Sequence, residues 1–168
     1  SAASDVYKRQ DIWNITALVV SVLSVLLSLY ALRQATTKNT SDMYLFFISQ
    51  YAKEDMKLAL RKLKDIKRGV YRLEQWESDM KNNLPKAFEY DEARRLVKYF
   101  YDTLAYMKLE KLIEARFVRL ICLKKGAWLY LDTVEAMEKF FDSGYDKKPY
   151  AVIRDVCENL RKEGCCPP

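Results

Sequence analysis

The feature that most constrains this chain is an uncharged, apolar stretch of 21 residues near its amino terminus, Ile12 to Leu32. It contains neither proline nor glycine, and the basic residue Arg33 follows it directly. At about 1.5 Å of rise per residue, a helix of this length crosses the roughly 30 Å hydrocarbon core of a bilayer. A helix on the surface of a globular domain would carry a charged stripe, which is missing here. The stretch predicts one transmembrane helix over residues 11–33.

The ten residues before it resemble translated laboratory DNA. The run Asp5-Val-Tyr-Lys-Arg-Gln10 matches one reading frame of a common transposase-based sequencing adapter, and the preceding bases of that adapter encode residues 1–4. Such a segment is excluded from reasoning about the fold. We therefore leave Lys8 and Arg9 out of the topology argument, and we expect the natural amino terminus to lie upstream.

Charges on the two sides of the predicted span indicate its orientation. Only Asp11 precedes it, whereas the basic residues on its carboxyl side are Arg33, Lys38, Lys53 and Lys57. The positive-inside rule then places the amino terminus outside and the rest of the chain in the cytoplasm. Trp13, Tyr30 and Arg33 are expected at the membrane interfaces. A cleaved signal peptide is the alternative, but its apolar region would run only about 7–15 residues.

Small residues recur on one face of the predicted span, at spacings of three and four. They are Ala17, Ser21, Ser24, Ser28 and Ala31. Small side chains let membrane helices approach closely, so this face is a candidate seam for a homodimer. Alternatively, the serines are simply tolerated because their hydroxyls bond to carbonyls of their own helix.

The remaining sequence has the pattern of an all-α cytoplasmic bundle. A polar hinge is expected over 34–41, a helical domain over 42–163 and a short tail over 164–168. Apolar residues at helical spacing predict helices over about 42–67, 71–80, 91–107 and 112–123, then one after a turn at 124–126 and a last one from about 149. Asp91 is interpreted as a helix cap, and Leu96 as a core residue. The alternation typical of strands is missing.

The native excess of positive charge is concentrated in one segment. Of the net charge of +6, +5 remains without residues 1–10, and residues 53–72 carry eight basic and three acidic side chains. A stripe at helical spacing comprises Lys53, Lys57, Arg61, Lys64 and Arg68. It is interpreted in three ways: an ordinary solvated face, a surface for anionic lipid, or a footprint for nucleic acid or an acidic partner. No nucleic-acid-binding motif accompanies it, so nucleic acid is not the expected partner.

No catalytic constellation stands out. The chain contains no histidine, which removes the commonest general base and metal ligand. Glu74 with Glu77, and Glu135 with Glu138, place paired carboxylates on helical faces, as in Mg²⁺-dependent all-α nucleotide hydrolases. The second acidic pair that those enzymes need, ending in aspartate, is missing. We expect no metal and no cofactor, and we interpret the adjacent Cys165 and Cys166 as part of a plain tail.

Several apolar spacings resemble a prokaryotic family of membrane-anchored helical proteins known only as a domain of unknown function. They are the end of the span from Ser28 to Gln34, the pattern Val97-x-x-Phe-Tyr-x-x-Leu104, the segment Leu109 to Ile113, Trp128, and Thr133-Val-Glu-Ala-Met137. The resemblance implies a span and a cytoplasmic helical domain, and no reaction. The sequence thus predicts a non-enzymatic interaction module anchored in the inner membrane, with an unidentified protein partner.

Overall fold

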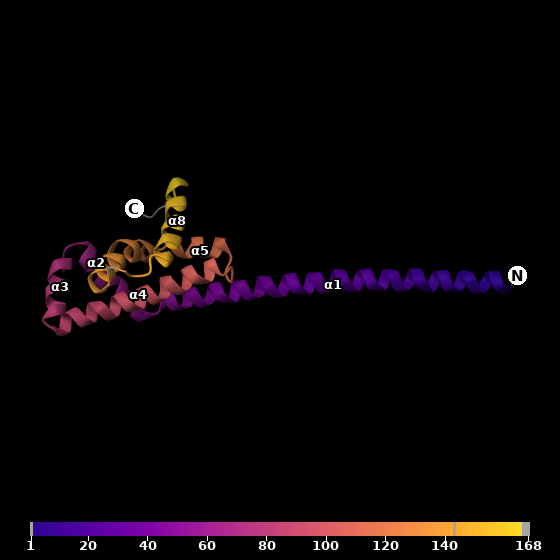
Figure 1. Ribbon diagram of the computed structural model, residues 1–168, viewed down its shortest axis with the longest axis horizontal. Helices are drawn as coiled ribbons and strands as arrows, with labels where there is room; N and C mark the ends of the chain where they lie inside the picture. Colours follow the sequence, from indigo (N-terminus) through magenta and orange to yellow (C-terminus); the bar gives the residue numbers. More distant parts are fainter. Residues whose placement is uncertain (1, 143, 166–168) are drawn as a thin grey trace. The chain divides into compact units, whose positions relative to one another are not determined.

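The structure is a computed structural model that describes the backbone of residues 2–142 and 144–165. Side chains are described for residues 20–32, 34, 41–142 and 144–165. Every element in this part of the chain is helical, which confirms the all-α prediction (Figure 1). The elements are α1 (Ala2–Ala52), α2 (Glu54–Lys67), α3 (Leu73–Lys81), α4 (Pro85–Leu109), α5 (Ala115–Cys122), α6 (Lys125–Leu129), the π-helical turn η1 (Tyr130–Val134), α7 (Glu135–Phe141) and α8 (Lys148–Lys162).

Contacts divide the chain into two compact units, Ser1–Asp42 and Met43–Pro168. The first unit consists of the greater part of α1. The second unit, called here the helical domain, begins with the last turns of α1 and contains α2 to α8. Each unit is described by itself below.

Helix α1 continues through residues 34–41, where the sequence predicts a polar hinge. Threonine, asparagine and serine are only mildly unfavourable inside a helix, and this segment contains no glycine or proline that would end it. The interruption falls instead at Lys53, whose backbone is extended (φ −60°, ψ 148°), and α2 begins at the next residue. Neither glycine nor proline marks this position, so the packing of the domain, not a local breaker, determines it.

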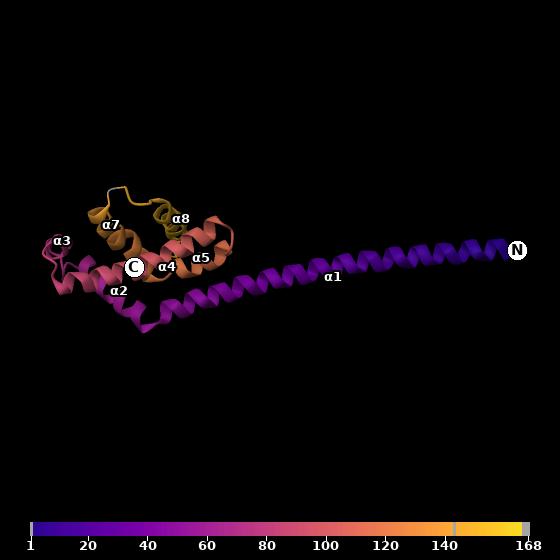
Figure 2. The same ribbon diagram turned by 60° about the horizontal axis from the view of Figure 1, so that its bottom comes forward.

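Helix α4 is the central element of the helical domain and packs against α2, α3, α5, η1 and α8. Figures 1 and 2 show α3 near one end of α4 and α5 near the other. It begins at Pro85, because the fixed φ of proline suits the first helical position and no hydrogen bond is lost there. The interpretation of Asp91 as its cap is therefore wrong.

Asp91 lies inside α4 and is buried, because two arginines and not a helix terminus satisfy its carboxylate. Arg94 Nε donates to Asp91 Oδ1 at 2.7 Å, and Arg95 is 2.7 Å from Oδ2. Arg94 also pairs with the buried Glu138 of α7. Charges taken out of water need such partners, so this ion network ties α7 to α4.

A continuous series of aromatic contacts runs through the core. Phe47 of α1 packs edge-on against Phe100 of α4, with ring centroids 5.4 Å apart. The series continues through Tyr101 and Tyr130 to Tyr150 of α8, and the last two rings are stacked at 4.5 Å and 5°. Aromatic pairs of this geometry add stability beyond the area they bury. The last turns of α1 are therefore part of the core of the domain.

The expected turn at 124–126 is replaced by the start of α6, with Gly126 inside the helix and buried. Its N–H donates to the Tyr51 hydroxyl at 3.2 Å. A Cβ at this position would lie 2.7 Å from the Tyr101 hydroxyl and 3.0 Å from that of Tyr51. Here glycine permits close packing of α6 against two tyrosines and is not a helix breaker.

Among the residues whose side chains are described, no helix has an apolar stretch long enough to cross a bilayer. The first part of the predicted span, residues 12–19, and Arg33 lie outside these residues.

Candidate functional site

The described part of the predicted span exposes a mostly apolar surface. Every side chain from Val20 to Leu32 is exposed within the chain, including that of Tyr30. Leu27 and Leu32, for example, are 67% and 65% accessible. Trp13, Ala17 and Arg33, the other expected members of the interface belt and the seam, lie outside the described side chains.

The serines of the predicted seam bond within their own helix. Ser24 Oγ donates to the carbonyl of Val20, and Ser28 Oγ donates to the carbonyl of Ser24, both at 2.8 Å. Hydroxyls satisfied in this way suit an apolar environment. These hydrogen bonds fit the interpretation that the serines are simply tolerated in the span. They are also compatible with a close-packed seam, because the side chains remain small whichever bonds they make.

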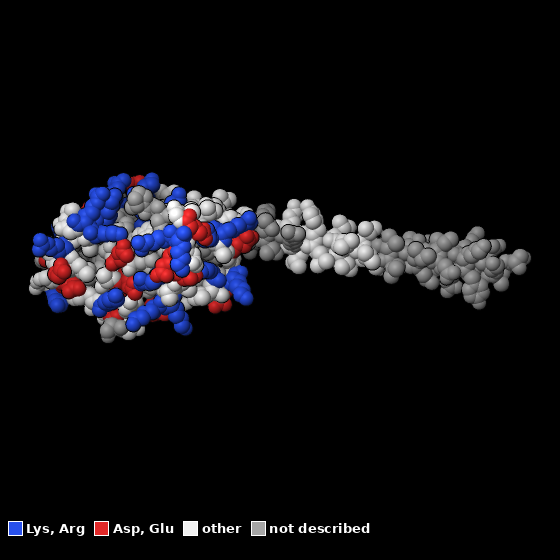
Figure 3. Space-filling view, turned by 90° about the horizontal axis from the view of Figure 1, so that it is seen from above, with Lys and Arg blue, Asp and Glu red and all other residues white. Residues whose placement is uncertain are grey.

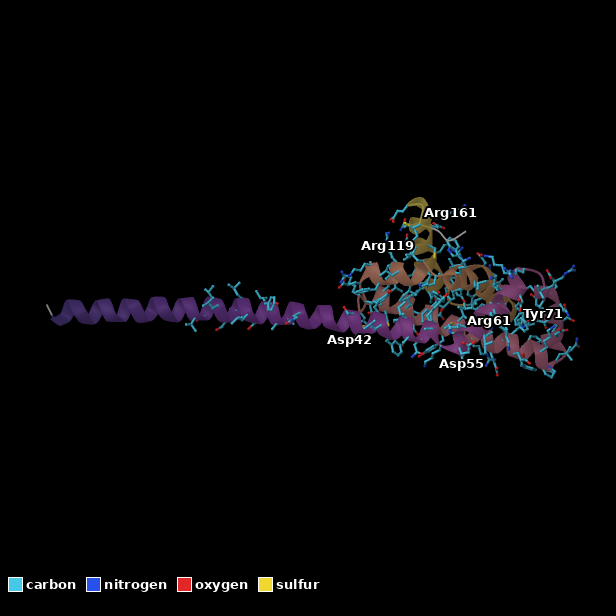
Figure 4. All side chains as sticks on the ribbon, turned by 180° about the vertical axis from the view of Figure 1, so that it is seen from behind. Asp42, Asp55, Arg61, Tyr71, Arg119 and Arg161 are labelled. Carbon is cyan, nitrogen blue, oxygen red and sulfur yellow. The ribbon has the colours of Figure 1, made fainter. Side chains whose placement is uncertain are left out.

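The basic stripe lies on one exposed face of α2 and its flanks. Lys53, Lys57, Arg61, Lys64 and Arg68 are all exposed, whereas α2 buries Met56, Ala59, Leu63 and Ile66 on its other face. Arg61, labelled in Figure 4, is one of these exposed residues. We call these five residues the basic face.

Internal pairing neutralises little of the basic face. Glu54 is 3.4 Å from Lys57 and 3.8 Å from Arg61, so one carboxylate serves two cations. Lys53, Lys64 and Arg68 form no ion pair with any residue that the structure describes. On the side of the helical domain seen in Figure 3, by contrast, Lys and Arg are interspersed with Asp and Glu. The basic face is therefore a local excess of positive charge.

An apolar pocket of about 380 Å³ opens beside the start of the basic face. It lies between the end of α1, the first turn of α2 and the middle of α4. Its apolar lining consists of Phe46, Phe47, Met56, Leu96, Tyr99 and Phe100. Gln50, Lys53, Asp55 and Thr103 complete the lining. The volume and the mixture of aromatic walls with a few polar groups are typical of small-molecule sites.

Helical spacing in the sequence does not predict this pocket. It depends on the break at Lys53, which turns α2 away from α1, and no residue type announces that break. Leu96, predicted as a core residue, lies at the pocket and is 38% accessible. Tyr99 is also exposed, a fact that the helical spacing of the sequence does not reveal.

Of the two carboxylate pairs considered for a hydrolase, Glu135 with Glu138 is engaged by other groups in the chain. Glu135 accepts hydrogen bonds from the Tyr145 hydroxyl at 2.7 Å and from Arg154 at 2.5 Å, and Glu138 pairs with Arg94. Among the described residues, no group of three or more His, Cys, Asp or Glu side chains could hold a metal ion. Oxygens engaged in this way are poor candidates for binding Mg²⁺.

Several buried tyrosines and the thiol of Cys122 have raised pKa values. Burial and the hydrogen bond to Glu135 raise the pKa of Tyr145 to about 12. Burial also raises the pKa of the Tyr130 hydroxyl, and so does the hydrogen bond that this hydroxyl donates to Asp102. The hydrogen bond shared with Cys157, together with burial, raises the pKa of Cys122. These groups therefore stay protonated near neutral pH, which suits a structural role better than proton transfer.

No family model matches the chain, and no curated protein or solved structure is significantly similar to it.

Proposed function

We propose that this chain is a single-pass, membrane-anchored helical module that binds a partner and performs no reaction. In this proposal residues 12–32 cross the bilayer, the amino terminus lies outside, and the helical domain lies in the cytoplasm of a prokaryotic cell. The observation that carries the proposal is the exposure of every side chain from Val20 to Leu32. Their exposed fraction is large among the residues whose side chains are described, for example 67% for Leu27.

The chemistry of this segment favours lipid as its surroundings. Fully burying a leucine or valine side chain is worth about 1.5–3 kcal/mol, so a run of them left in water is strongly unfavourable. A helix also satisfies all of its own backbone groups, as hydrocarbon requires. The hydroxyls of Ser24 and Ser28 are also satisfied within the helix, because they donate to its carbonyls.

The basic face suits contact with the inner leaflet. Two of its five cations, Lys57 and Arg61, pair with Glu54, and each Lys or Arg near an anionic membrane contributes about 1 kcal/mol of attraction. A negatively charged protein would be attracted by the same face. We propose the lipid surface because the predicted span brings the chain to a membrane.

The membrane claim predicts a specific effect of charge in the apolar segment. The double substitution Leu23→Asp and Leu26→Asp should release the full chain from bacterial membranes into the supernatant on alkaline carbonate extraction. Each aspartate near the bilayer centre costs about 2.5–3.5 kcal/mol. The matched control, Leu45→Asp with Leu112→Asp, changes two exposed leucines of the helical domain and should leave the protein in the pellet. Extraction of the unaltered chain would contradict the proposal.

The lipid role of the basic face predicts selective binding to anionic vesicles. A fragment of residues 39–168 should float with phosphatidylglycerol vesicles and not with phosphatidylcholine vesicles. Changing Lys57, Arg61, Lys64 and Arg68 to glutamine should weaken this binding by more than tenfold, given the attraction per cation.

For the control, four exposed lysines elsewhere in the domain are changed to glutamine, namely Lys111, Lys124, Lys125 and Lys162. This variant should lose less affinity than the first. Equal losses would show that net charge alone matters, and the basic face would then have no special role.

The homodimer seam predicts that bulk on the small face prevents self-association. Changing Ser21, Ser24 and Ser28 to leucine should abolish the signal of the span in a bacterial transmembrane-association reporter, because the helices can no longer approach closely. Val22→Phe with Leu26→Phe adds bulk to the opposite face and should preserve the signal. If the leucine variant still associates, the serines are tolerated and form no seam.

A further inference from the structure

Two buried thiols meet in the core of the helical domain, between α5 and α8. Cys122 ends α5 and Cys157 lies within α8, and each is 1% accessible. Both are free cysteines, and Cys122 donates a hydrogen bond to the sulfur of Cys157. They belong to different helices and are far apart in the sequence. The packing of the domain, and not the local sequence, therefore brings the two sulfurs together.

The helices that carry the thiols are held against each other at this point. α5 packs against α8, and Figures 1 and 2 show the two helices next to each other. Beside Cys122, α5 buries Val118 and Ile121. Arg119, one turn before Cys122 and labelled in Figure 4, donates to Glu163 just after α8 at 2.9 Å. The contact between the thiols is thus part of a packed seam between two helices.

The surroundings make the two thiols chemically unequal. The hydrogen bond from Cys122 lowers the pKa of Cys157, and the positive charge of Arg154 does the same, whereas burial opposes them. The shared hydrogen bond and burial raise the pKa of Cys122, and the charge of Lys108 opposes this rise only in part. Cys157 is therefore the sulfur that ionises first. A reactive thiolate beside a second, resolving thiol is typical of redox-sensing cysteines.

The Tyr101 hydroxyl is a further polar group near the thiols, and the fold leaves it unpaired. It is fully buried and has no hydrogen-bond partner within the described part of the chain. Burial raises its pKa, and so do neighbouring charges, those of Cys122 and Cys157 among them. A phenol that stays protonated is a hydrogen-bond donor, and oxygen bound to sulfur is a better acceptor than a thiol.

We propose that Cys122 and Cys157 are a redox dithiol that hydrogen peroxide closes into a disulfide between α5 and α8. The Cys157 sulfur attacks one peroxide oxygen, the O–O bond breaks, and the released hydroxide takes up the Cys157 proton to form water. The Cys122 sulfur then attacks the sulfur of the resulting sulfenic acid. The S–O bond breaks, and the leaving hydroxide forms a second water with the Cys122 proton. Two thiols are thus oxidised to one disulfide, and one peroxide is reduced to two waters.

Burial determines which oxidant can react. Thiols that are 1% accessible admit a small uncharged molecule during local opening of the last helix, and they exclude a bulky disulfide such as oxidised glutathione. The bond would close α6, η1 and α7 into a covalent loop. Disulfides that form transiently in a reducing compartment serve redox sensing or catalysis. The thiol pair lies in the helical domain, so this role does not rest on the proposed membrane anchor.

Peroxide treatment of the full chain tests the inference. Cys165 and Cys166 are changed to serine so that only the pair remains, and the folded protein is oxidised, denatured and alkylated. Its mass should fall by two hydrogen atoms, and tryptic peptides 120–124 and 155–161 should be linked. A phosphine reductant should reverse both changes. Alkylation of both thiols, or a sulfinic acid at either one without a disulfide, would overturn the inference.

A displaced cysteine provides the matched control. Cys122→Ser with Leu120→Cys keeps one cysteine on each helix and moves the first from the core to an exposed position of α5. This variant should form no intramolecular disulfide. If it closes as fast as the original pair, contact in the core is not what joins the sulfurs, and the inference is wrong. With the original pair, oxidised glutathione should react more slowly than peroxide at the same concentration, and an equal or faster reaction would contradict the proposed oxidant.

The melting temperature shows whether the disulfide fits the native fold. Oxidation should raise it by about 10 °C, because a cross-link over this separation restricts the unfolded chain. The circular dichroism spectrum should not change, and the displaced variant should show no rise. A melting temperature that falls on oxidation would mean that the bond distorts the helices, which contradicts the contact on which the inference depends.

Discussion

The transfer of apolar side chains out of water is the constraint on which this account depends. From Val20 to Leu32 the chain forms a regular helix that satisfies its own backbone and, at Ser24 and Ser28, its own hydroxyls. Its remaining surface is apolar and lies open. Such a helix is stable in hydrocarbon and unfavourable in water, so its surroundings, not its internal bonds, decide where the chain resides.

The helical domain is held together by different interactions. The aromatic series from Phe47 to Tyr150 and the ion network around Asp91 join α1, α4, α7 and α8 without any group from outside. These interactions hold the core of the domain together. Two of its surface features, the basic face and the apolar pocket, meet at Lys53. Both are suited to binding, and neither provides a nucleophile with an adjacent base.

The spacing of apolar residues predicted the all-α class and most of the helices, because residues three and four apart lie on one face of a helix. The buried face of α2 and its end at Lys67 follow from that pattern. Asp91 was misread because an acidic residue before an apolar run resembles a cap, and only its contacts with Arg94 and Arg95 show otherwise. Pro85 was the better signal for the start of α4.

Long-range packing determines the two features that the sequence did not predict, namely the break at Lys53 and the apolar pocket. No glycine or proline marks the break at Lys53, although Glu54 and Asp55 suit the first turn of the helix that follows, and the pocket forms where α2 packs on α4. The residues of the basic face could be listed from spacing, since one helix carries almost all of them. The pocket joins segments 40 residues or more apart, such as Met56 and Leu96, and spacing carries no information about that approach.

The most direct test asks what surrounds residue 26. A nitroxide is attached to Leu26→Cys in the full chain, with Cys165 and Cys166 changed to serine, and the protein is reconstituted in lipid. Its collision rates with oxygen, which enters hydrocarbon, and with a polar nickel complex, which does not, are compared with those of a label at Leu45. The account predicts that oxygen dominates at residue 26 and the nickel complex at residue 45. Equal access of the nickel complex to both positions would contradict it.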